Sequence, residues 1–495
     1  MNIVSRIEQR AAAGGWLERP AYHCPDRSWT HAQVHRLAAA AAARLAARGV
    51  CAGDRVLLAL PDDIGFIAAF LGVARLGAVA VLANPRLAEA DHRYLAQDSG
   101  ACLCVIQGDQ LAGRFDRRVD VAALIDPAGA PTPQQVPAAP ARPDDPVYIQ
   151  YTSGTTGRPK GVVHTHADID DYALSSGEDI IAASPEDVIL SVSKLYFAYG
   201  FCNSLVFPLY SGASAVLLPH SFDPALTAAA VRRHAVTILF AVPSAYVKLL
   251  ADDAADAACF KSVRAAVSAG EAMRASLHRE LGAILTTSVL DQIGCTEAGQ
   301  AFCSNTVHQD TPGTLGRPVR GFTLQVRDGE GRPLPDGREG ELWVTGPTLV
   351  SGYLNRGEAG SAVFADGWFN TRDRVVRNPD GTFTHLGRDD DIEIVGGVNV
   401  SPFEIEEVLR RHPAVGEAAV VAVRDELGAS RLTAFVVPAR GTAPDETWLA
   451  DQLACLAREH LAPFKVPQAV RVVGDLPRTA SGKLRRFVLR GEQRS

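Results

Sequence analysis

The sequence predicts an α/β protein with a large N-terminal domain of stacked, mostly parallel sheets and a small, mobile α+β C-terminal domain. Three observations lead to this fold class. The chain has 495 residues, more than a single core accommodates, so at least two domains are expected. Hydrophobic residues make up 47% and charged residues 21%, which is typical of a folded globular protein. Short apolar runs alternate with helical patterns, the rhythm of β-α-β units.

The alternation covers most of the N-terminal part. Residues 30 to 150 carry apolar runs such as VLLAL and AVAVLA, and the Ala-rich stretch from Leu37 to Leu45 has the spacing of a packed helix. A Pro- and Ala-rich segment over residues 126 to 146 predicts a surface connection. Between residues 147 and 300 further strands follow, among them PVYIQY, AVLLP and VTILFAV. We therefore expect a mostly parallel sheet covered by helices.

The pattern changes between residues 313 and 386, where β runs are broken by turn signals such as DGEG and NPDG. A β-rich subdomain is expected there. After Gly387, the segment Ser401-Pro402-Phe403-Glu404 has the spacing of a capping box, with Pro at the first helical position. The predicted domains are residues 1 to 388 and residues 389 to 495.

Charge and composition exclude several classes of function. The formal net charge is −7, so nothing favours nucleic acid or an anionic membrane as a partner. The N-terminus lacks a long apolar core, and no run reaches about 20 apolar residues, so we expect a cytoplasmic protein without a membrane span. The nine cysteines are scattered and lack zinc-ligand spacing, which favours small core hydrophobes. A homodimer is compatible with this composition.

The strongest local signal is a loop of glycines and hydroxyl side chains between an apolar strand and Lys160. Its residues are Thr152, Ser153, Gly154, Thr155, Thr156 and Gly157. The glycines let backbone N–H groups turn inward, the hydroxyls add donors and Lys160 adds charge, so the loop predicts a phosphate cradle. A polar surface turn is the alternative. Only six of the 49 basic residues are Lys, so the presence of one of them in this loop indicates that the site requires a compact ammonium group.

The loop TSGTTGRPKG resembles the signature loop of the acyl-adenylate-forming superfamily, which includes acyl-CoA synthetases, peptide-synthetase adenylation domains and luciferases. Four further segments resemble the other motifs of that superfamily, in the same order. They are QIGCTE at 292–297, NTRD at 370–373, GRDDD at 387–391 and RTASGK at 478–483. The resemblance implies that ATP and Mg²⁺ adenylate a carboxylic acid, whose acyl group then passes to the thiol of coenzyme A.

The resemblance also implies roles for single residues. Glu297 is expected to hold Mg²⁺, and Thr296 to contact the α-phosphate. Asp373 is expected to accept both ribose hydroxyls, with Arg388 assisting at the sugar. The expected adenine-side residues of the ATP site are Gly270, Glu271, Ala272, Asp291 and Gln292.

Three further expectations fall in the C-terminal part of the chain. Lys483 is expected to bridge the substrate carboxylate and the α-phosphate, where negative charge accumulates during the attack of one anion on another. Asp390 takes the position of the superfamily's hinge residue, about which the small domain rotates. Gly396 and Gly397 suit contact with the pantetheine of coenzyme A. A solvated charge is the alternative for Lys483, and a solvated turn is the alternative for Asp390.

The segments SVSKLYFAYGF, SAGEAM and IGCTEAGQAFCSN resemble benzoate-CoA ligases and related aryl-CoA ligases. The expected acyl pocket consists of Phe197, Ala198, Tyr199, Gly200, Ser268, Ala269, Ile293, Gly294 and Gln300. No carboxylate lies within 196–200 to pair an ammonium, which disfavours an amino acid as the substrate. Ala298, Gly299 and Gln300 replace bulkier residues and a His of the benzoate pattern. We therefore hypothesise a hydroxy- or aminobenzoate as the acid.

Other functions stay open at this point. Relatives of this kind also load the phosphopantetheine of a carrier protein or another nucleophile, and a medium-chain fatty acid is an alternative substrate. A catalytically inactive, adenylate-binding regulatory protein belongs to a different class. The set of Lys160, Glu297, Asp373 and Lys483 argues against such an inactive protein.

Substitution of Lys483 separates the two half-reactions. Lys483→Ala is expected to abolish adenylation, because the charge that offsets the developing anion is removed, and to leave thioester formation from a supplied acyl-adenylate largely intact. The two rates are measured separately by mass spectrometry of AMP and of the thioester. Equal loss of both half-reactions would contradict this role.

Overall fold

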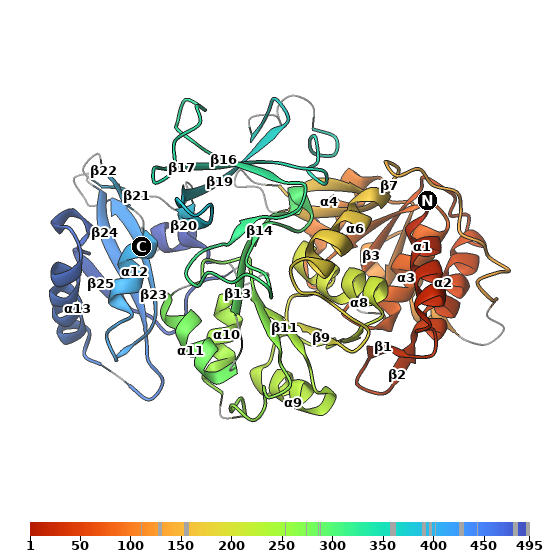
Figure 1. Ribbon diagram of the computed structural model, residues 1–495, viewed down its shortest axis with the longest axis horizontal. Helices are drawn as coiled ribbons and strands as arrows, with labels where there is room; N and C mark the ends of the chain where they lie inside the picture. The colour runs from red at the N-terminus through yellow and green to blue at the C-terminus, as the bar shows by residue number, and fades with distance from the viewer. Residues whose placement is uncertain are drawn as a thin grey trace. The chain divides into compact units, whose positions relative to one another are not determined.

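The computed structural model describes residues 1–109, 111–126, 131–152, 158–252, 254–273, 275–285, 287, 289–356, 363–388, 393–395, 398–400, 402–424, 430–442, 444–478 and 484–491. The chain divides into two compact units. The first comprises residues 1–324 and 344–369, and the second comprises residues 325–343 and 370–495. Both units combine helices with sheets, so the predicted α/β class is confirmed (Figure 1).

A six-stranded sheet forms one layer of the first unit. Its order is β6-β5-β3-β4-β7-β8, and every neighbouring pair is parallel except β7 and β8. All five residues of β4 are buried, which explains why such strands appear as unbroken apolar runs in the sequence. The strands are β3 (Arg55–Ala59), β4 (Val79–Ala83), β5 (Leu103–Ile106), β6 (Arg118–Asp120), β7 (Pro146–Thr152) and β8 (Lys160–Thr165).

A nine-stranded sheet forms the other layer of the first unit. Its order is β15-β14-β13-β12-β11-β9-β10-β1-β2, with a parallel centre and antiparallel strands at both edges. The strands are β1 (Pro20–His23), β2 (Ser28–Thr30), β9 (Val188–Ser191), β10 (Ser214–Val216), β11 (Ile238–Ala241), β12 (Ala265–Ser268), β13 (Val289–Gly294), β14 (Ala301–Ser304) and β15 (Arg317–Pro318).

The Ala-rich stretch forms a helix, as predicted. Helix α2 (His31–Ala46) starts at a capping box between Thr30 and Gln33, and it packs against α3 (Ile64–Arg75). The two helices approach closely, because a Cβ placed on Gly72 of α3 would lie 2.7 Å from the Cβ of Ala41. Every residue of α3 is buried, which fits its apolar sequence.

Further helices cover the two sheets of the first unit. Helices α9, α10 and α11 share one apolar core with β11, β12 and β13, and they lie along the same face of these strands in Figure 1. The helices are α1 (Ile3–Gly14), α4 (Glu89–Ser99), α5 (Ala122–Ile125), α6 (His166–Tyr172), α7 (Ala198–Phe201), α8 (Phe207–Ser211), α9 (Pro224–His234), α10 (Pro243–Leu250) and α11 (Ala275–Leu285).

The stretch predicted to be β-rich contains several strands in antiparallel pairs, with β19 flanked by β18 and β20. The strands are β16 (Thr323–Arg327), β17 (Glu339–Thr345), β18 (Phe364–Ala365), β19 (Trp368–Arg377) and β20 (Phe383–Arg388). The predicted domain boundary after residue 388 stays a prediction.

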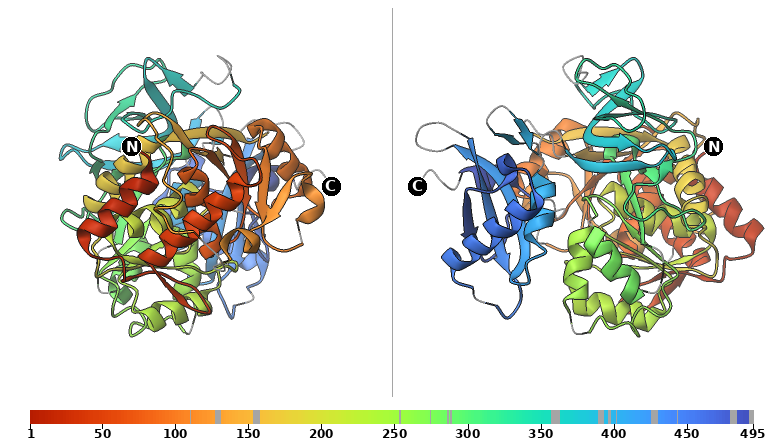
Figure 2. Two further views of the ribbon diagram at one scale, coloured as in Figure 1. Left: turned by 90° about the vertical axis from the view of Figure 1, so that its right-hand side faces the viewer. Right: turned by 60° about the vertical axis from the view of Figure 1, so that its left-hand side comes forward.

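The C-terminal part of the second unit is a three-stranded sheet with helices packed on it (Figure 2). Helix α12 (Pro402–Leu409) begins at Pro402, as the capping-box spacing predicts. Residues of α12 and α13 share a core with one face of β23 and β24, and Leu489 of α14 packs on the other face. The remaining elements are β21 (Glu393–Val395), β22 (Val398–Val400), β23 (Val415–Arg424), β24 (Ser430–Pro438), β25 (Ala469–Val472), α13 (Glu446–His460) and α14 (Arg486–Gly491).

Two composition-based expectations bear on the fold. Across the described ranges, no helix has both the length and the apolar character needed to cross a membrane. The nine cysteines all lie in described ranges, none of them forms a disulfide, and five of them are buried. Buried thiols of this kind act as small hydrophobic side chains.

Candidate active site

The predicted catalytic residues of the first unit follow the carboxyl ends of its strands. Strand β7 ends at Thr152 and β8 starts at Lys160, and these two residues are direct partners in the antiparallel register. The loop that joins the strands therefore begins and ends at one edge of the sheet. Ser153, Gly154, Thr155, Thr156 and Gly157 of this loop lie outside the described residues.

Lys160 and Glu297 share a neighbour, Tyr353. The hydroxyl of Tyr353 donates a hydrogen bond of 2.7 Å to Oε1 of Glu297, and the ammonium of Lys160 lies 4.8 Å from the centre of the Tyr353 ring. Glu297 is only 7% exposed. A buried carboxylate needs hydrogen bonds or a cation to offset its lost hydration. Tyr353 thus lies beside both the carboxylate of Glu297, the predicted Mg²⁺ ligand, and the ammonium of Lys160, the predicted phosphate-binding cation.

A chain of buried hydrogen bonds holds the backbone of the Thr296–Glu297 turn. Nε2 of His164 donates to the carbonyl of Thr296 at 2.8 Å, and the hydroxyl of Tyr172 lies 2.9 Å from Nδ1 of the same ring. Nε2 must carry a proton to bond the carbonyl, and in the neutral ring Nδ1 then accepts from Tyr172. The Tyr148 hydroxyl donates to Tyr172 at 3.4 Å. The turn is therefore tied to β8, the strand that begins with Lys160.

Gly299 allows this packing. Its φ is +73°, and a Cβ at this position would lie 1.7 Å from the Tyr172 hydroxyl oxygen. Any side chain would displace the tyrosine and strain the backbone. Gly299 replaces a bulkier residue of the benzoate pattern, but the space that this frees is occupied by Tyr172, so the position has no room for a side chain.

The predicted adenine-side residues lie at the ends of β12 and β13. Ser268 of β12 and Asp291 of β13 are partners in the parallel register. Gly270 has a φ of +84°, and Ala272 lies in the same connection. Both carboxylate oxygens of Glu271 accept hydrogen bonds from Ser244, at 2.9 and 3.0 Å. The Glu271 carboxylate therefore caps the start of α10.

Asp291 carries an unusual buried oxygen. Its Oδ1 has no hydrogen-bond partner in the part of the chain that the structure describes, while its backbone carbonyl accepts from Asn305. Burial raises the pKa of Asp291 well above its usual value. Gln292 differs, because its side-chain oxygen accepts from Ser304 at 3.3 Å. An unpaired acceptor of this kind fits a donor such as the exocyclic amino group of adenine.

The predicted ribose-binding residues belong to the second unit. Asp373 on β19 and Arg388 on β20 are direct partners in an antiparallel pair, with a distance of 3.9 Å between the guanidinium and Oδ1. Nε2 of His385 lies 3.1 Å from the same oxygen. Burial by itself raises the pKa of Asp373, but Arg388, His385 and Thr371 together lower it below its usual value. The ionised form that accepts two hydroxyls is therefore favoured.

Arg372 occupies a position where the superfamily motif has Gly. Its φ is +60°, the left-handed conformation that glycine adopts readily and other residues adopt at a cost. Asn370 supports it, because Oδ1 of Asn370 accepts a 2.8 Å hydrogen bond from the backbone N–H of Arg372. The backbone shape of the motif is thus retained without the glycine.

The predicted acyl-pocket residues belong to several elements of the first unit. Phe197 precedes α7, and its ring packs edge-on against Tyr196 at 4.8 Å. The Tyr199 hydroxyl donates to the Val267 carbonyl at 3.1 Å, and its ring lies 5.8 Å from Phe240. The other predicted positions on this side are Ala198 and Gly200 in α7, Ala269 after β12, and Ile293 and Gly294 at the end of β13.

Gln300 follows the Thr296–Glu297 turn and is buried. Its side-chain oxygen accepts from the N–H of Ala301 at 3.1 Å, which identifies the other terminal atom as the amide nitrogen. That nitrogen has no partner among the described residues. The Gln300 backbone lies against Gly294, where a Cβ would be 2.5 Å from the Gln300 carbonyl. The amide therefore offers a buried, unused donor.

The residues present fit a magnesium ion that is shared with a nucleotide. In the described ranges, no group of three or more His, Cys, Asp or Glu gathers as a protein-only cage. Mg²⁺ does not need one, because it commonly takes one or two carboxylates together with phosphate oxygens and water. Glu297 supplies such a carboxylate, whose Oε1 is fixed by Tyr353.

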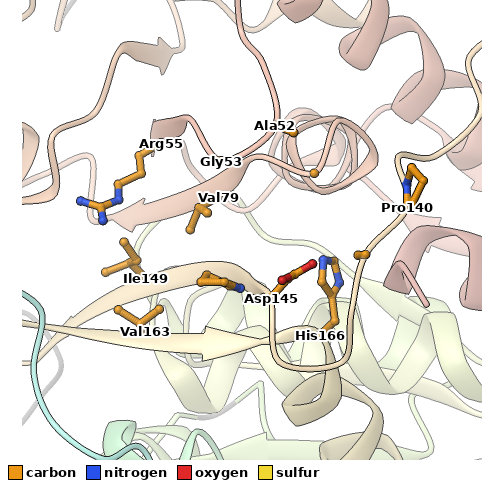
Figure 3. A pocket seen from close by; sticks show the side chains of 12 residues that line it. Ala52, Gly53, Arg55, Val79, Pro140, Asp145, Ile149, Val163 and His166 are labelled. Carbon is orange, nitrogen blue, oxygen red and sulfur yellow. The ribbon is translucent and has the colours of Figure 1, made fainter.

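A cavity of about 400 Å³ lies at the other end of the six-stranded sheet (Figure 3). It is lined by the residues that begin β3, β4 and β7, among them Arg55 and Pro146. None of the predicted site residues lines this cavity. The candidate site follows the carboxyl ends of the strands, where ligands bind in open α/β sheets, and the cavity is separate from it.

Several predicted residues cannot be placed. Lys483, Asp390, Gly396 and Gly397 lie outside the described residues. Conversely, His164, Tyr353 and His385 support the site and were absent from the sequence-based prediction. Tyr353 stands 56 positions from Glu297, and His385 stands 12 positions from Asp373 outside the motif segments, so motif spacing gave no signal for either.

Comparison with known proteins places the chain among adenylating enzymes. The family model described as AMP-binding enzyme matches residues 8–354, and the model of the AMP-binding enzyme C-terminal domain matches residues 404–483. The chain is 40% identical to the p-hydroxybenzoic acid–AMP ligase FadD22 of Mycobacterium marinum, over 99% of this chain and 69% of that protein. It is 35% identical to a 4-hydroxybenzoate–CoA/benzoate–CoA ligase of Rhodopseudomonas palustris, over 99% and 94% of the two chains. The crystal structure of the anthranilate CoA ligase AuaEII in complex with anthranoyl-AMP superposes with a TM-score of 0.92 at 31% identity, covering 99% of this chain and 97% of that one.

His164→Ala is expected to raise the KM for MgATP and to lower kcat/KM by about 10- to 100-fold, the usual effect of losing a supporting group behind a metal ligand. The substitution frees the Thr296 carbonyl and loosens the turn that carries Glu297. His164→Gln keeps a donor of similar reach and should recover part of the loss. Steady-state kinetics with varied MgATP measure both effects.

His278→Ala is the matched control. Nε2 of His278 donates to the Val289 carbonyl at 3.0 Å, so this variant also loses one imidazole–carbonyl bond in the first unit. If His164→Ala changed thermal stability as His278→Ala does and left the KM for MgATP unaltered, the positioning role of His164 would be wrong.

Proposed function

Because this chain belongs to the AMP-binding enzymes of the acyl-adenylate-forming superfamily and is an acid–thiol ligase, we propose that it activates a substituted benzoate and transfers the aroyl group to coenzyme A. ATP and the acid form an acyl-adenylate and pyrophosphate. The thiol then displaces AMP and forms the thioester. The observation that carries the choice of acid is the unused amide donor of Gln300 beside Gly294.

The aromatic side chains support a flat acid. Tyr196 and Phe197 precede α7 and pack edge to face, and Tyr199 within α7 packs edge to face on Phe240, an arrangement that aromatic rings prefer. The Tyr199 hydroxyl is already bonded to a backbone carbonyl, so its ring is held in place. A medium-chain fatty acid has no aromatic ring to pack against these fixed side chains.

Gln300 favours a polar substituent on the ring. A buried amide nitrogen without a partner costs free energy, and a ring oxygen would satisfy it. The names of three similar proteins include p-hydroxybenzoic acid, 4-hydroxybenzoate and anthranilate, which are hydroxy- and aminobenzoates. A hydroxybenzoate is therefore the first choice, and an aminobenzoate the second.

In the proposed mechanism, each charged residue binds or stabilises a different part of the substrates. Lys160 and the loop before it bind the triphosphate, and Thr296 contacts the α-phosphate. When bound, Mg²⁺ would neutralise phosphate charge, and Glu297 would hold it. In the second unit, Asp373 accepts the ribose hydroxyls while His385 and Arg388 keep it ionised. Lys483 stabilises the charge that develops as the carboxylate attacks.

Asp291 and Gln292 complete the proposed nucleotide site. The free Oδ1 of Asp291 is the proposed partner of the exocyclic amino group of adenine. After adenylation, the hinge at Asp390 lets the C-terminal part turn, and Gly396 and Gly397 contact pantetheine.

A second acceptor has one observation in its favour. The relative with 40% identity is named an AMP ligase, and the chain matches 69% of its length. A carrier-protein phosphopantetheine or another nucleophile is therefore the alternative acceptor to coenzyme A. The adenylation half-reaction is the same in both cases.

The proposal is tested with ATP, Mg²⁺ and coenzyme A across a panel of benzoates, cinnamates and medium-chain fatty acids, with AMP and thioesters measured by mass spectrometry. A thioester formed with a hydroxy- or aminobenzoate supports acid and acceptor together. AMP without thioester moves the acceptor to a carrier protein or another nucleophile. Activity confined to fatty acids would overturn the proposal.

Gln300→Leu tests whether the Gln300 side chain recognises the ring substituent. The variant keeps most of the side-chain volume and removes the amide donor, so kcat/KM for the preferred hydroxybenzoate should fall by about three- to tenfold, the worth of one net hydrogen bond. Plain benzoate is the internal control, and its kcat/KM should stay within about twofold. A parallel fall for both acids would show that Gln300 does not contact the substituent.

A further inference from the structure

A buried ion pair lies at the carboxyl ends of two strands from different sheets. Asp62 follows β3 of the six-stranded sheet and is 3% exposed, while Lys194 follows β9 of the nine-stranded sheet. The ammonium of Lys194 is 3.9 Å from Oδ2 of Asp62, and its side chain is 14% exposed. Burying two opposite charges costs more desolvation energy than it commonly returns. An ion pair buried at this position is therefore expected to have a role other than stabilising the fold.

The pair is hydrogen-bonded directly to the start of residues 195–200, the segment that carries Tyr196, Phe197 and Tyr199. Oδ1 of Asp62 accepts the backbone N–H of Leu195 at 3.0 Å, and the Lys194 ammonium donates to the Leu218 carbonyl at 2.7 Å. The carbonyl of Lys194 accepts the N–H of Phe197 at 2.9 Å. Asp62 therefore holds the backbone from which Phe197 and α7 begin.

Gly200 shows how tightly this segment turns. A Cβ at Gly200 would lie 2.2 Å from the Lys194 carbonyl oxygen and 2.4 Å from that of Ser193. The chain from 193 to 200 thus folds back on itself over the ion pair. Any displacement of Lys194 moves the residues that carry the rings of Tyr196, Phe197 and Tyr199.

The electrostatic surroundings couple the pair to its neighbours. Burial raises the pKa of Asp62 to about 6, although Lys194 and the Leu195 N–H act in the opposite direction. Burial lowers the pKa of Lys194, Asp62 raises it, and Arg86 lowers it. Tyr196 also faces Asp62 and Arg86. The charge on Asp62 is thus lost at mildly acidic pH, with Lys194, Arg86 and Tyr196 as the groups around it.

We infer that Asp62 and Lys194 are positioning residues for the aryl-acid pocket, which they shape by fixing the segment from Leu195 to Gly200 while touching neither the acid nor ATP. This inference rests on the proposed function, since it takes that segment as a wall of the acid's pocket. It adds a selectivity determinant that lies outside the adenylation motifs.

Asp62→Asn removes the charge and keeps the acceptor for Leu195. This variant should raise the KM for the aryl acid about tenfold or more, because small misplacements of binding groups are costly, and leave the KM for ATP within about twofold. Lys194→Met should act in the same direction. The matched control is Asp256→Asn, since Asp256 pairs with Arg232 at 2.9 Å, both side chains are more than half exposed, and Oδ1 likewise accepts a backbone N–H, from Cys259. The control should change neither KM.

A pH profile separates positioning from a merely structural role. Below about pH 6 the wild-type carboxyl becomes neutral and resembles the Asn variant. The wild-type to Asp62→Asn ratio of kcat/KM for the acid should therefore be large at pH 8 and approach one toward pH 5. Titration of ATP and of the acid cancels in this ratio. A ratio that stays constant across this range would overturn the inference.

Hydrogen exchange distinguishes a failure of the positioning role from a failure of the proposed function. Lys194→Met should speed amide exchange in the peptide that covers residues 194–201, whatever the substrate is. If that exchange rises but the wild type activates no aryl acid, the proposed function fails and the positioning of the segment stands. If aryl acids are activated equally by the wild type and both variants, and exchange is unchanged, the inference fails.

Discussion

The turn that carries Thr296 and Glu297 is the feature on which the proposed chemistry depends. A carboxylate that attacks a phosphate brings two anions together, so charge must be placed accurately and kept from water. Glu297 is buried and held by Tyr353, while His164 holds the backbone of the preceding residue. Lys160 and His164 lie on one strand, so the cradle and the turn are joined through β8. Gly299 then gives Tyr172 the space that this arrangement needs.

Much of the fold could be predicted because it depends on local patterns. Short apolar runs and helical spacing predicted the alternation of strands and helices, and the capping-box spacing predicted the start of α12 at Pro402. The fold class is confirmed, since solved relatives at more than 30% identity superpose over nearly the whole chain. Thr296 and Glu297 follow the end of β13, whereas Asp373 and Arg388 lie within strands, and the ligand contacts of all these residues stay predictions.

Other features could not be predicted, for physical reasons. Tyr353 meets Glu297 across 56 positions of the sequence, and Asp62 meets Leu195 across 133. Such contacts follow from the packing of sheets and loops and leave no periodic trace in the sequence. Arg372 is different, because its residue type argues against a left-handed conformation and only the local bond to Asn370 shows how the turn is kept. At Gly299, comparison with the benzoate pattern showed only that a smaller residue replaces a bulkier one, and the structure shows that Tyr172 fills that space.

The central claim is that the acid's own oxygen becomes bonded to the α-phosphate of ATP. Incubation with ATP, Mg²⁺, coenzyme A and 4-hydroxybenzoate labelled with ¹⁸O in its carboxylate tests this directly, with mass spectrometry of the nucleotide product. The account predicts AMP that carries one ¹⁸O atom, because the acyl C–O bond of the adenylate breaks when the thiol attacks. Label found in inorganic phosphate together with ADP, or unlabelled AMP alongside the thioester, would contradict it.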